Sequence, residues 1–330
     1  MCLYSKLIRN KRYQTTIKNG GLIPAVNDER QLYAPIKCRK CLECRKQRGR
    51  DWSIRLFEEV KQNKGGIFIT LTFNKESYAK INSMSIEKKD KDGNEYTVNI
   101  NDLEGYEKDN AIATKAVRLF TERYRKATGK QPRRWLVTEL GHNGTERIHL
   151  HGIIWSKVSR EKLKELWGYG FVWDGYNEIQ GSVNYVNDTT IKYLTKYLTK
   201  IDTKHKNYTS IVLASKGIGG KYDGEFNIYK GEKTNESYTT GTGHKVALPS
   251  YYRNKIYSDD EKERLWTAKL DKNIRYVCGE IARTDKEYYE LLEYHQKRAN
   301  QLGYGCKNDW NRITAQEERK IYLQKRELGT

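Results

Sequence analysis

The chain has 330 residues, with 62 lysines and arginines against 42 aspartates and glutamates, so its net charge is +20 at neutral pH. Such an excess of positive charge indicates a polyanionic partner, most simply a nucleic acid. No stretch approaches the roughly 20 apolar residues of a membrane-spanning helix. The polar, basic start MCLYSKLIRNKRYQ predicts no secretory leader. We therefore expect a cytoplasmic protein without a membrane partner, large enough for one large domain or two smaller ones.

The first predicted segment, residues 1–65, is basic and carries three closely spaced cysteines, Cys38, Cys41 and Cys44. Disulfides are unlikely in a long chain without a leader, so the Cys-x2-Cys-x2-Cys run indicates either structural zinc or reduced thiols. Three thiolates are one ligand short of a tetrahedral zinc site. Cys2 or a distant cysteine could supply the fourth, and spacing alone does not choose. After the trio, an amphipathic helix is predicted to end near Gly65-Gly66.

Residues 66–205 predict an α+β domain. In chain order we expect a strand at 67–73, a charged insertion at 74–110 with an Asp92-Gly93 turn, a helix at 111–127, a hairpin at 134–155, a short helix at 159–167, one or two strands within 171–186 and a helix at 188–200. This order predicts a mainly antiparallel sheet with helices on one face, close to a ferredoxin-like palm. Residues 206–330 read as glycine- and lysine-rich loops followed by a charged helical extension, which either packs on the core or binds DNA.

The hairpin contains a candidate cation site. His149 and His151 are two residues apart in a strand, so both imidazoles project to the same side. Glu139, in the preceding strand, is the candidate third ligand. A two-residue Asn143-Gly144 turn would set Glu139 opposite Ile148, on the wrong face, whereas a three-residue loop sets it opposite His149. The cation hypothesis therefore predicts a loop of odd length or a bulge. The alternative is an ordinary strand with two hydrogen-bonded histidines.

The predicted helix at 188–200 contains Tyr-Leu-Thr-Lys twice, with Asp188 as its expected cap. Tyr193 and Tyr197 are four residues apart and so share one face. An apolar stripe (Ile191, Leu194, Leu198) and a basic stripe (Lys192, Lys196, Lys200) flank the two rings. A tyrosine is a poor nucleophile at its free pKa near 10, but a nearby lysine could lower that pKa or neutralise developing charge. We therefore take the two tyrosines, with Lys196 and Lys200, as catalytic candidates. Alternatively, the rings only cover the edge of the core.

These residues together resemble the HUH endonuclease superfamily in its two-tyrosine class of replication initiators. More narrowly, the chain is similar to the replication initiation proteins of small single-stranded DNA phages of the gokushovirus type, in Microviridae. The motifs that carry the resemblance lie between residues 38 and 257: CRKCLECR, FITLTF, HLHGIIW, YLTKYLTK, SKGIG and LPSYYRNKIY. The middle motif departs from the family, which usually has Gly-Glu-Tyr-Gly where this chain has Thr-Glu-Leu-Gly at residues 138–141.

The resemblance implies a complete function. Glu139, His149 and His151 would hold Mg²⁺ or Mn²⁺ against the scissile phosphate. One tyrosine would attack, leaving a 5′-phosphotyrosyl link and a 3′-hydroxyl that primes rolling-circle synthesis, and the second would later release a closed circle. The implied partners are single-stranded DNA at the phage origin and, in the cytoplasm of the host bacterium, a helicase and a polymerase. The chain has no phosphate-binding loop of its own. Among basic side chains, Lys192 and Arg134 are expected to contact DNA.

Two other hypotheses stay open. A transposase or plasmid initiator of the same superfamily would share the cation site, although the phage-like flanking motifs favour the initiator. A non-catalytic nucleic-acid-binding protein with structural Zn²⁺ would explain the charge and the cysteines, but it would leave the histidine and tyrosine pairs as coincidences. Formation of a metal-dependent covalent DNA adduct separates the enzymes from the binding protein.

Overall fold

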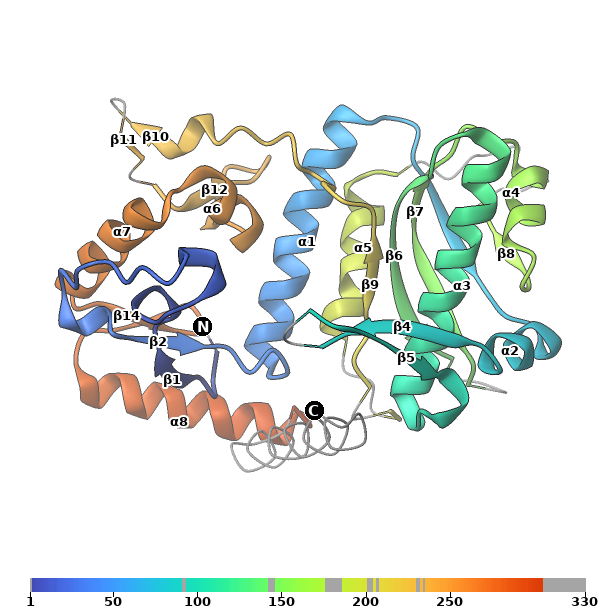
Figure 1. Cartoon of the computed structure of the whole chain (residues 1–330). Coiled ribbons are helices and arrows are strands. Elements are labelled where there is room, and N and C mark those ends of the chain that lie inside the picture. Colours follow the sequence, from blue (N-terminus) through green and yellow to red (C-terminus); the bar gives the residue numbers. More distant parts are fainter. Residues whose placement is uncertain are drawn as a thin grey trace. The chain divides into compact units, whose positions relative to one another are not determined.

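The chain folds into two compact units in a computed structural model (Figure 1), which describes residues 2–90, 93–141, 146–175, 186–200, 204–205, 208–229, 232–233 and 235–304. One unit is Gly49–Tyr222, and the other joins Met1–Arg48 to Asp223–Thr330. The predicted core, residues 66–205, lies inside the first of these. That unit extends further at both ends because residues 49–62 supply a helix and residues 212–214 a strand that packs with the sheet.

A five-stranded antiparallel sheet forms the centre of the Gly49–Tyr222 unit. Its order is β8-β3-β7-β6-β9, with β3 at Ile67–Leu71, β6 at Arg133–Leu140, β7 at Ile148–Trp155, β8 at Val172–Trp173 and β9 at Val212–Ala214. β6 and β7 form the predicted hairpin and lie beside each other at the middle of the sheet. The residues of the predicted hairpin loop and residues 176–185 lie outside the described residues, so a second strand in that later region is not addressed.

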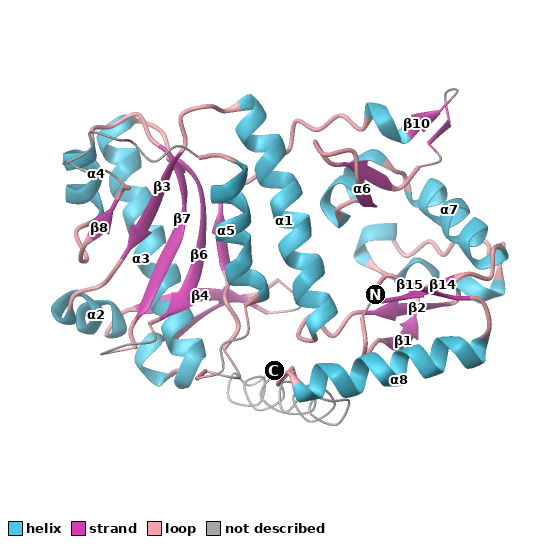
Figure 2. Cartoon of the chain, turned by 180° about the vertical axis from the view of Figure 1, so that it is seen from behind, coloured by secondary structure: helices cyan, strands magenta, loops and turns pink. Residues whose placement is uncertain are grey.

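Helices cover both faces of this sheet, as Figure 2 shows. On one face lie α2 (Lys75–Asn82), α3 (Gly105–Thr128) and α4 (Arg160–Trp167), and on the other α1 (Leu42–Gln62) and α5 (Asp188–Thr199). Buried side chains such as Phe120 fill the first layer, and Leu56 and Leu194 fill the second. The α+β class with an antiparallel sheet is confirmed. The prediction of helices on one face was wrong, because an apolar stripe identifies the buried side of a helix but not the face of the sheet that it covers.

The ends of several helices follow the sequence signals. α3 begins earlier than predicted, at Gly105, and ends where Gly129 adopts a left-handed conformation. Ser159 caps α4 by accepting from the backbone N–H of Lys162, as predicted. Within the insertion, β4 (Ser85–Lys89) pairs with β5 (Glu95–Asn99), while Asp92 of the expected turn lies outside the described residues.

The other unit is built from small hairpins and charged helices. Its strands are β1 (Lys6–Arg9), β2 (Tyr33–Ile36), β10 (Ile228–Tyr229), β11 (Glu232–Lys233), β12 (Ser237–Thr239), β13 (Lys245–Ala247), β14 (Arg275–Val277) and β15 (Glu280–Ala282), and its helices are α6 (Ser250–Ile256), α7 (Asp259–Asp271) and α8 (Asp285–Gln301). The hydroxyl of Tyr13 donates to Glu263 across 2.6 Å and so ties the N-terminal segment to α7. Among the described residues, no helix is both long and apolar enough to cross a membrane.

Candidate active site

The register of the central hairpin brings the three predicted ligands together. Glu139 of β6 lies directly opposite His149 of β7, and His151 projects to the same face of the sheet. The Nε2 atoms of His149 and His151 lie 3.3 Å and 3.1 Å from Oε2 of Glu139. One ligand atom from each residue lies within 4.8 Å of the others. The pairing of Glu139 with His149 is the register that the cation hypothesis required.

The other ring nitrogen of each histidine has its own partner. Nδ1 of His151 lies 2.9 Å from the hydroxyl of Thr70 in β3, and Nδ1 of His149 lies 3.4 Å from the backbone carbonyl of Arg147. Partners of this kind fix the orientation of an imidazole and direct its Nε2 toward a cation. Two imidazoles and one carboxylate form a donor set that divalent first-row cations accept. The residues present therefore fit a divalent ion. Thr70 is a site residue that the sequence did not reveal, since only strand pairing brings β3 beside β7.

Lys200, at the C-terminal end of α5, completes the charge balance of this cluster. Its Nζ lies 2.8 Å from Oε1 of Glu139, on the carboxylate oxygen that the histidines do not use. Burial alone would raise the pKa of Glu139, but hydrogen bonds from His149, His151 and Lys200 outweigh burial and hold that pKa below its ordinary range. Glu139 is thus a carboxylate at neutral pH.

His151 is prepared to act as a neutral ligand. Burial lowers the pKa of His151, and the hydrogen bond to Glu139, which acts in the opposite direction, does not offset this effect. Its side chain is only 12% exposed. Because a metal binds the unprotonated imidazole nitrogen, the lowered pKa favours the ligand form.

The tyrosines of α5 lie directly over these ligands. The ring of Tyr197 is parallel to that of His151, with ring centroids 4.6 Å apart and an interplanar angle of 1°. The Tyr197 hydroxyl donates to the Tyr193 hydroxyl across 2.5 Å. Burial, then the hydrogen bond with Tyr193 and the charge of Glu139, raise the pKa of Tyr197 above its ordinary value. Tyr193 is 48% exposed and therefore open to a large substrate.

The apolar stripe of α5 sets this arrangement. Ile191, Leu194 and Leu198 are buried in the core between α5, α1 and the sheet, as the periodicity predicted. The helix cap differs from the prediction: Asn187, not Asp188, accepts from the backbone N–H of Thr190. Asp188 is instead the first helical residue, where its charge still favours the helix dipole.

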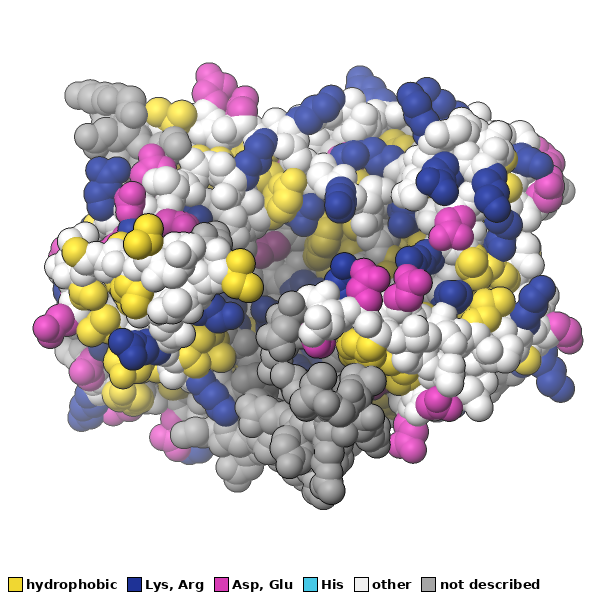
Figure 3. Space-filling view, in the orientation of Figure 1, with side chains coloured by type: hydrophobic (Ala, Val, Ile, Leu, Met, Phe, Trp, Pro, Cys, Tyr) yellow, Lys and Arg dark blue, Asp and Glu magenta, His cyan; other side chains and the backbone are white. Residues whose placement is uncertain are grey.

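The remaining predicted residues are placed less uniformly. Lys192 and Lys196 are exposed on α5, and neither side chain contacts the two tyrosines by a hydrogen bond among the described residues. Arg134 is largely buried, and strand alternation puts it on the face of the sheet opposite Glu139. Burial lowers its pKa. Figure 3 shows more lysine and arginine than acidic side chains on the visible face of the Gly49–Tyr222 unit, the face that carries α3.

The predicted cysteine trio is grouped in the other unit. Cys38, Cys41 and Cys44 lie beside Cys2, and all four are buried free thiols. Of the two fourth ligands that the sequence left open, a near and a distant cysteine, the structure brings in Cys2. Cys306 lies outside the described residues, and Cys278 is a free cysteine outside this group.

Comparison with known proteins points to DNA replication. Residues 66–202 match a family model of replication-associated proteins, the ORF2 family, and they include all the hairpin ligands and both tyrosines. The replication-associated protein ORF4 of Chlamydia phage 1, a Microviridae phage, is 23% identical over 313 residues, which are 84% of this chain and 67% of that protein. No solved structure matches. The two matches support the resemblance to replication initiators of Microviridae.

Proposed function

From this similarity to phage replication-associated proteins, we propose that the protein initiates rolling-circle replication by nicking single-stranded origin DNA through a tyrosine. The observation that carries the proposal is the stacking of Tyr197 on His151, at 4.6 Å between ring centroids. It sets a candidate nucleophile beside a cluster of three candidate cation ligands. A tyrosine on the edge of an ordinary core would not need such neighbours.

Glu139, His149 and His151 would hold the cation, Mg²⁺ or Mn²⁺. When bound there, a divalent cation withdraws charge from the non-bridging oxygens of a phosphate and orients the scissile bond. The side chains of this cluster are between 12% and 21% exposed, so a phosphate can approach them from one side. The hydrogen bond from Thr70 keeps His151 oriented while the substrate binds.

The nucleophile is a phenolic oxygen of Tyr193 or Tyr197. It forms a bond to phosphorus, the bond from phosphorus to the 3′ oxygen breaks, and the departing oxygen takes up a proton as the phenol gives one up. The products are a 5′-phosphotyrosyl link and a free 3′-hydroxyl. The raised pKa of Tyr197 means that its proton must be removed during attack, and the hydroxyl–hydroxyl contact gives that proton a path to Tyr193.

The second tyrosine serves to end the cycle. After one round of synthesis it would cleave the regenerated origin, and the retained 3′-hydroxyl would attack the first phosphotyrosyl bond and close the circle. The energy of the phosphodiester stays in the covalent link, so rejoining consumes no nucleotide. Lys200 would neutralise charge that develops on the phosphate, and the exposed Lys192 and Lys196 would bind the backbone of the DNA strand. A host helicase and polymerase in the bacterial cytoplasm would do the unwinding and synthesis.

The test is formation of a covalent adduct. The full chain is incubated with Mn²⁺ or Mg²⁺ and single-stranded fragments that tile the phage genome, and products are resolved on a denaturing gel. We expect a denaturant-stable protein–DNA adduct on one origin fragment, lost with EDTA and in His149→Ala. Peptide mapping of the adduct should identify Tyr193 or Tyr197.

Two matched variants sharpen this test. His244→Ala removes an exposed histidine far from the ligands in the sequence, and Tyr289→Phe removes an exposed hydroxyl on α8. Both should form the adduct as the wild type does. Tight binding of every fragment without any adduct would refute the endonuclease and favour the non-catalytic nucleic-acid-binding protein.

A further inference from the structure

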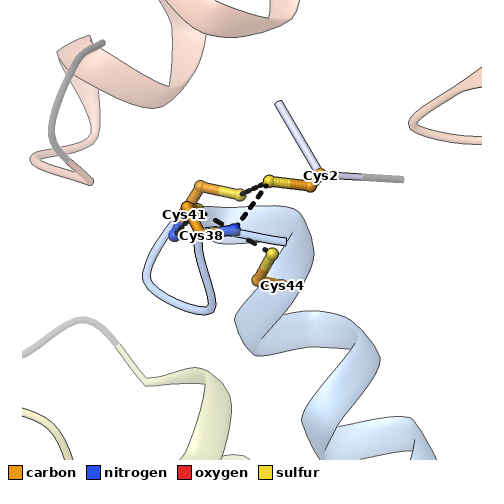
Figure 4. A group of neighbouring side chains, drawn as sticks. All are labelled: Cys2, Cys38, Cys41 and Cys44. Carbon is orange, nitrogen blue, oxygen red and sulfur yellow. Dashed lines mark hydrogen bonds between the residues drawn. The ribbon is translucent and has the colours of Figure 1, made fainter. Parts of the chain in front are cut away.

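Four cysteines that the proposed nicking reaction does not use converge at the start of α1. Figure 4 shows Cys2, Cys38, Cys41 and Cys44 with their sulfur atoms grouped beside the first turn of that helix. Three come from the Cys-x2-Cys-x2-Cys run, and the fourth comes from the beginning of the chain, 36 residues before Cys38. Their side chains are between 1% and 7% exposed.

We propose that these four cysteines form a closed, structural zinc site in which Cys2 is the fourth ligand. The Sγ atoms of Cys2 and Cys41 lie 3.9 Å apart, as do those of Cys38 and Cys44. A tetrahedral ion with Zn–S bonds of about 2.3 Å requires sulfur–sulfur distances of about 3.8 Å. A disulfide would bring two sulfurs to about 2.05 Å. The spacing therefore matches a shared single ion.

The backbone around the thiols supplies the hydrogen bonds that thiolate ligands need. Cys2 Sγ accepts from the backbone N–H of Cys38 at 3.3 Å and from that of Tyr4 at 3.4 Å. Cys38 Sγ accepts from the backbone N–H of Cys41, also at 3.3 Å. Such donors spread the negative charge of coordinated sulfurs and fix their direction. Arg45, one turn into the helix, adds a positive charge that interacts with Cys41.

All four positions of the tetrahedron are filled by protein sulfur, which leaves no place for water or substrate. Zinc sites of this type support the fold, whereas catalytic zinc sites keep one position open. Here the ion would fasten residues 2–4, which are buried although chain ends commonly fray. Gln296 of α8 donates to the backbone carbonyl of Leu3 at 2.6 Å, so the same segment is held from a second side.

The first experiment measures metal in the full chain purified without added zinc. Mass spectrometry of the metal content should find one zinc per chain in the wild type and in Cys278→Ser, whose thiol lies outside the group. Cys2→Ser should bind zinc at least about 100-fold more weakly, since even the loss of a group that only orients a ligand costs about 10–100-fold. Unchanged zinc affinity in Cys2→Ser, or iron in place of zinc, would overturn the proposal.

A second experiment separates this site from the Glu139 cluster. After exchange with Co²⁺, sulfur-to-metal charge-transfer absorption should persist in His149→Ala and vanish in Cys2→Ser. The wild type by itself gives a further readout that needs no variant to fold: the four cysteines should resist alkylation until a chelator is added, with Cys278 as the internal reference. Equal alkylation before and after the chelator would show four ordinary thiols.

Discussion

The imidazole of His151 and the phenol ring of Tyr197 lie face to face, with centroids 4.6 Å apart, although the two residues are on different elements and 46 positions apart. The contact joins the hairpin to α5. Tyr193, one turn earlier, reaches the same place through its hydroxyl and packs its ring edge-on against Phe68 at 5.9 Å. Both tyrosines are therefore within reach of a phosphate beside the candidate ligands.

Loss of both tyrosine hydroxyls should abolish nicking. Tyr193→Phe and Tyr197→Phe alone should each still form adduct on a linear single-stranded origin, because either hydroxyl can attack. The double variant should lose adduct formation by about 10³-fold or more, as expected when no nucleophile remains. The measurement is adduct formed per minute on a denaturing gel. Full cleavage by the double variant would exclude the two-tyrosine mechanism.

Lys200→Met should have opposite effects on cation binding and on nicking. Without the ammonium group at 2.8 Å, Glu139 loses a competing positive charge, so Mn²⁺ should bind more tightly. Nicking at saturating Mn²⁺ should fall by about 100-fold, since a charge that stabilises the transition state is gone.

Calorimetric titration with Mn²⁺ and the adduct assay measure these two effects separately. Lys192→Met removes an equal charge from the same helix without touching Glu139, so its Mn²⁺ affinity should equal that of the wild type. If Lys200→Met weakened Mn²⁺ binding, Lys200 would be supporting the ligand geometry instead of competing with the cation.

The buried ion pair of Glu59 with Arg133 should make stability depend on acid pH. The Glu59 side chain is 2% exposed and also accepts from the backbone N–H of Gly219 at 2.7 Å. Burial alone would raise the pKa of Glu59, but these partners hold it below its ordinary value. The stabilisation is therefore present above that ordinary value and is lost as pH falls through the lower, folded-state pKa.

Urea unfolding tests this dependence. Glu59→Gln should lower the free energy of unfolding by about 2 to 3 kcal/mol at pH 7, with Arg133 partly exposed and so partly compensated by water. The difference from the wild type should shrink between about pH 5 and pH 2. Glu165→Gln, which breaks an exposed pair with Lys162, should change stability by less than about 1 kcal/mol. A difference for Glu59→Gln that stayed constant with pH would contradict the ion-pair assignment.

Gly152 is required by the close approach of β6 and β7. A Cβ atom there would lie 2.1 Å from the carbonyl oxygen of Trp135 and 2.8 Å from Cα of Leu136, both backbone atoms that cannot move aside without separating the strands. Gly152→Ala should cost at least about 2 kcal/mol and weaken Mn²⁺ binding, because His151 is the adjacent residue.

Thermal unfolding provides the stability measurement for this variant. Gly241→Ala is the matched control, since a Cβ at Gly241 meets nothing within 4 Å. The control should unfold within a few degrees of the wild type. Equal midpoints for Gly152→Ala and Gly241→Ala would mean that the strands tolerate a side chain at this crossing.

The sequence alone determined those features that follow from local periodicity. Alternation along a strand put His149 and His151 on one side, and the helical repeat put Tyr193 and Tyr197 on one face, before any partner was known. It also predicted α4 with its cap at Ser159, because capping involves only neighbouring residues. None of these features depends on contacts between distant parts of the chain.

Only the tertiary structure decided which of these faces meet. The register of β6 against β7 put Glu139 opposite His149, and burial of Leu194 and Leu198 against the sheet turned Tyr197 onto His151. Distance along the chain also hid Cys2 as the neighbour of Cys38. The physical reason is the same in each case: strand pairing and core packing join residues far apart in sequence, and their geometry depends on the whole set of buried side chains, which no local pattern encodes.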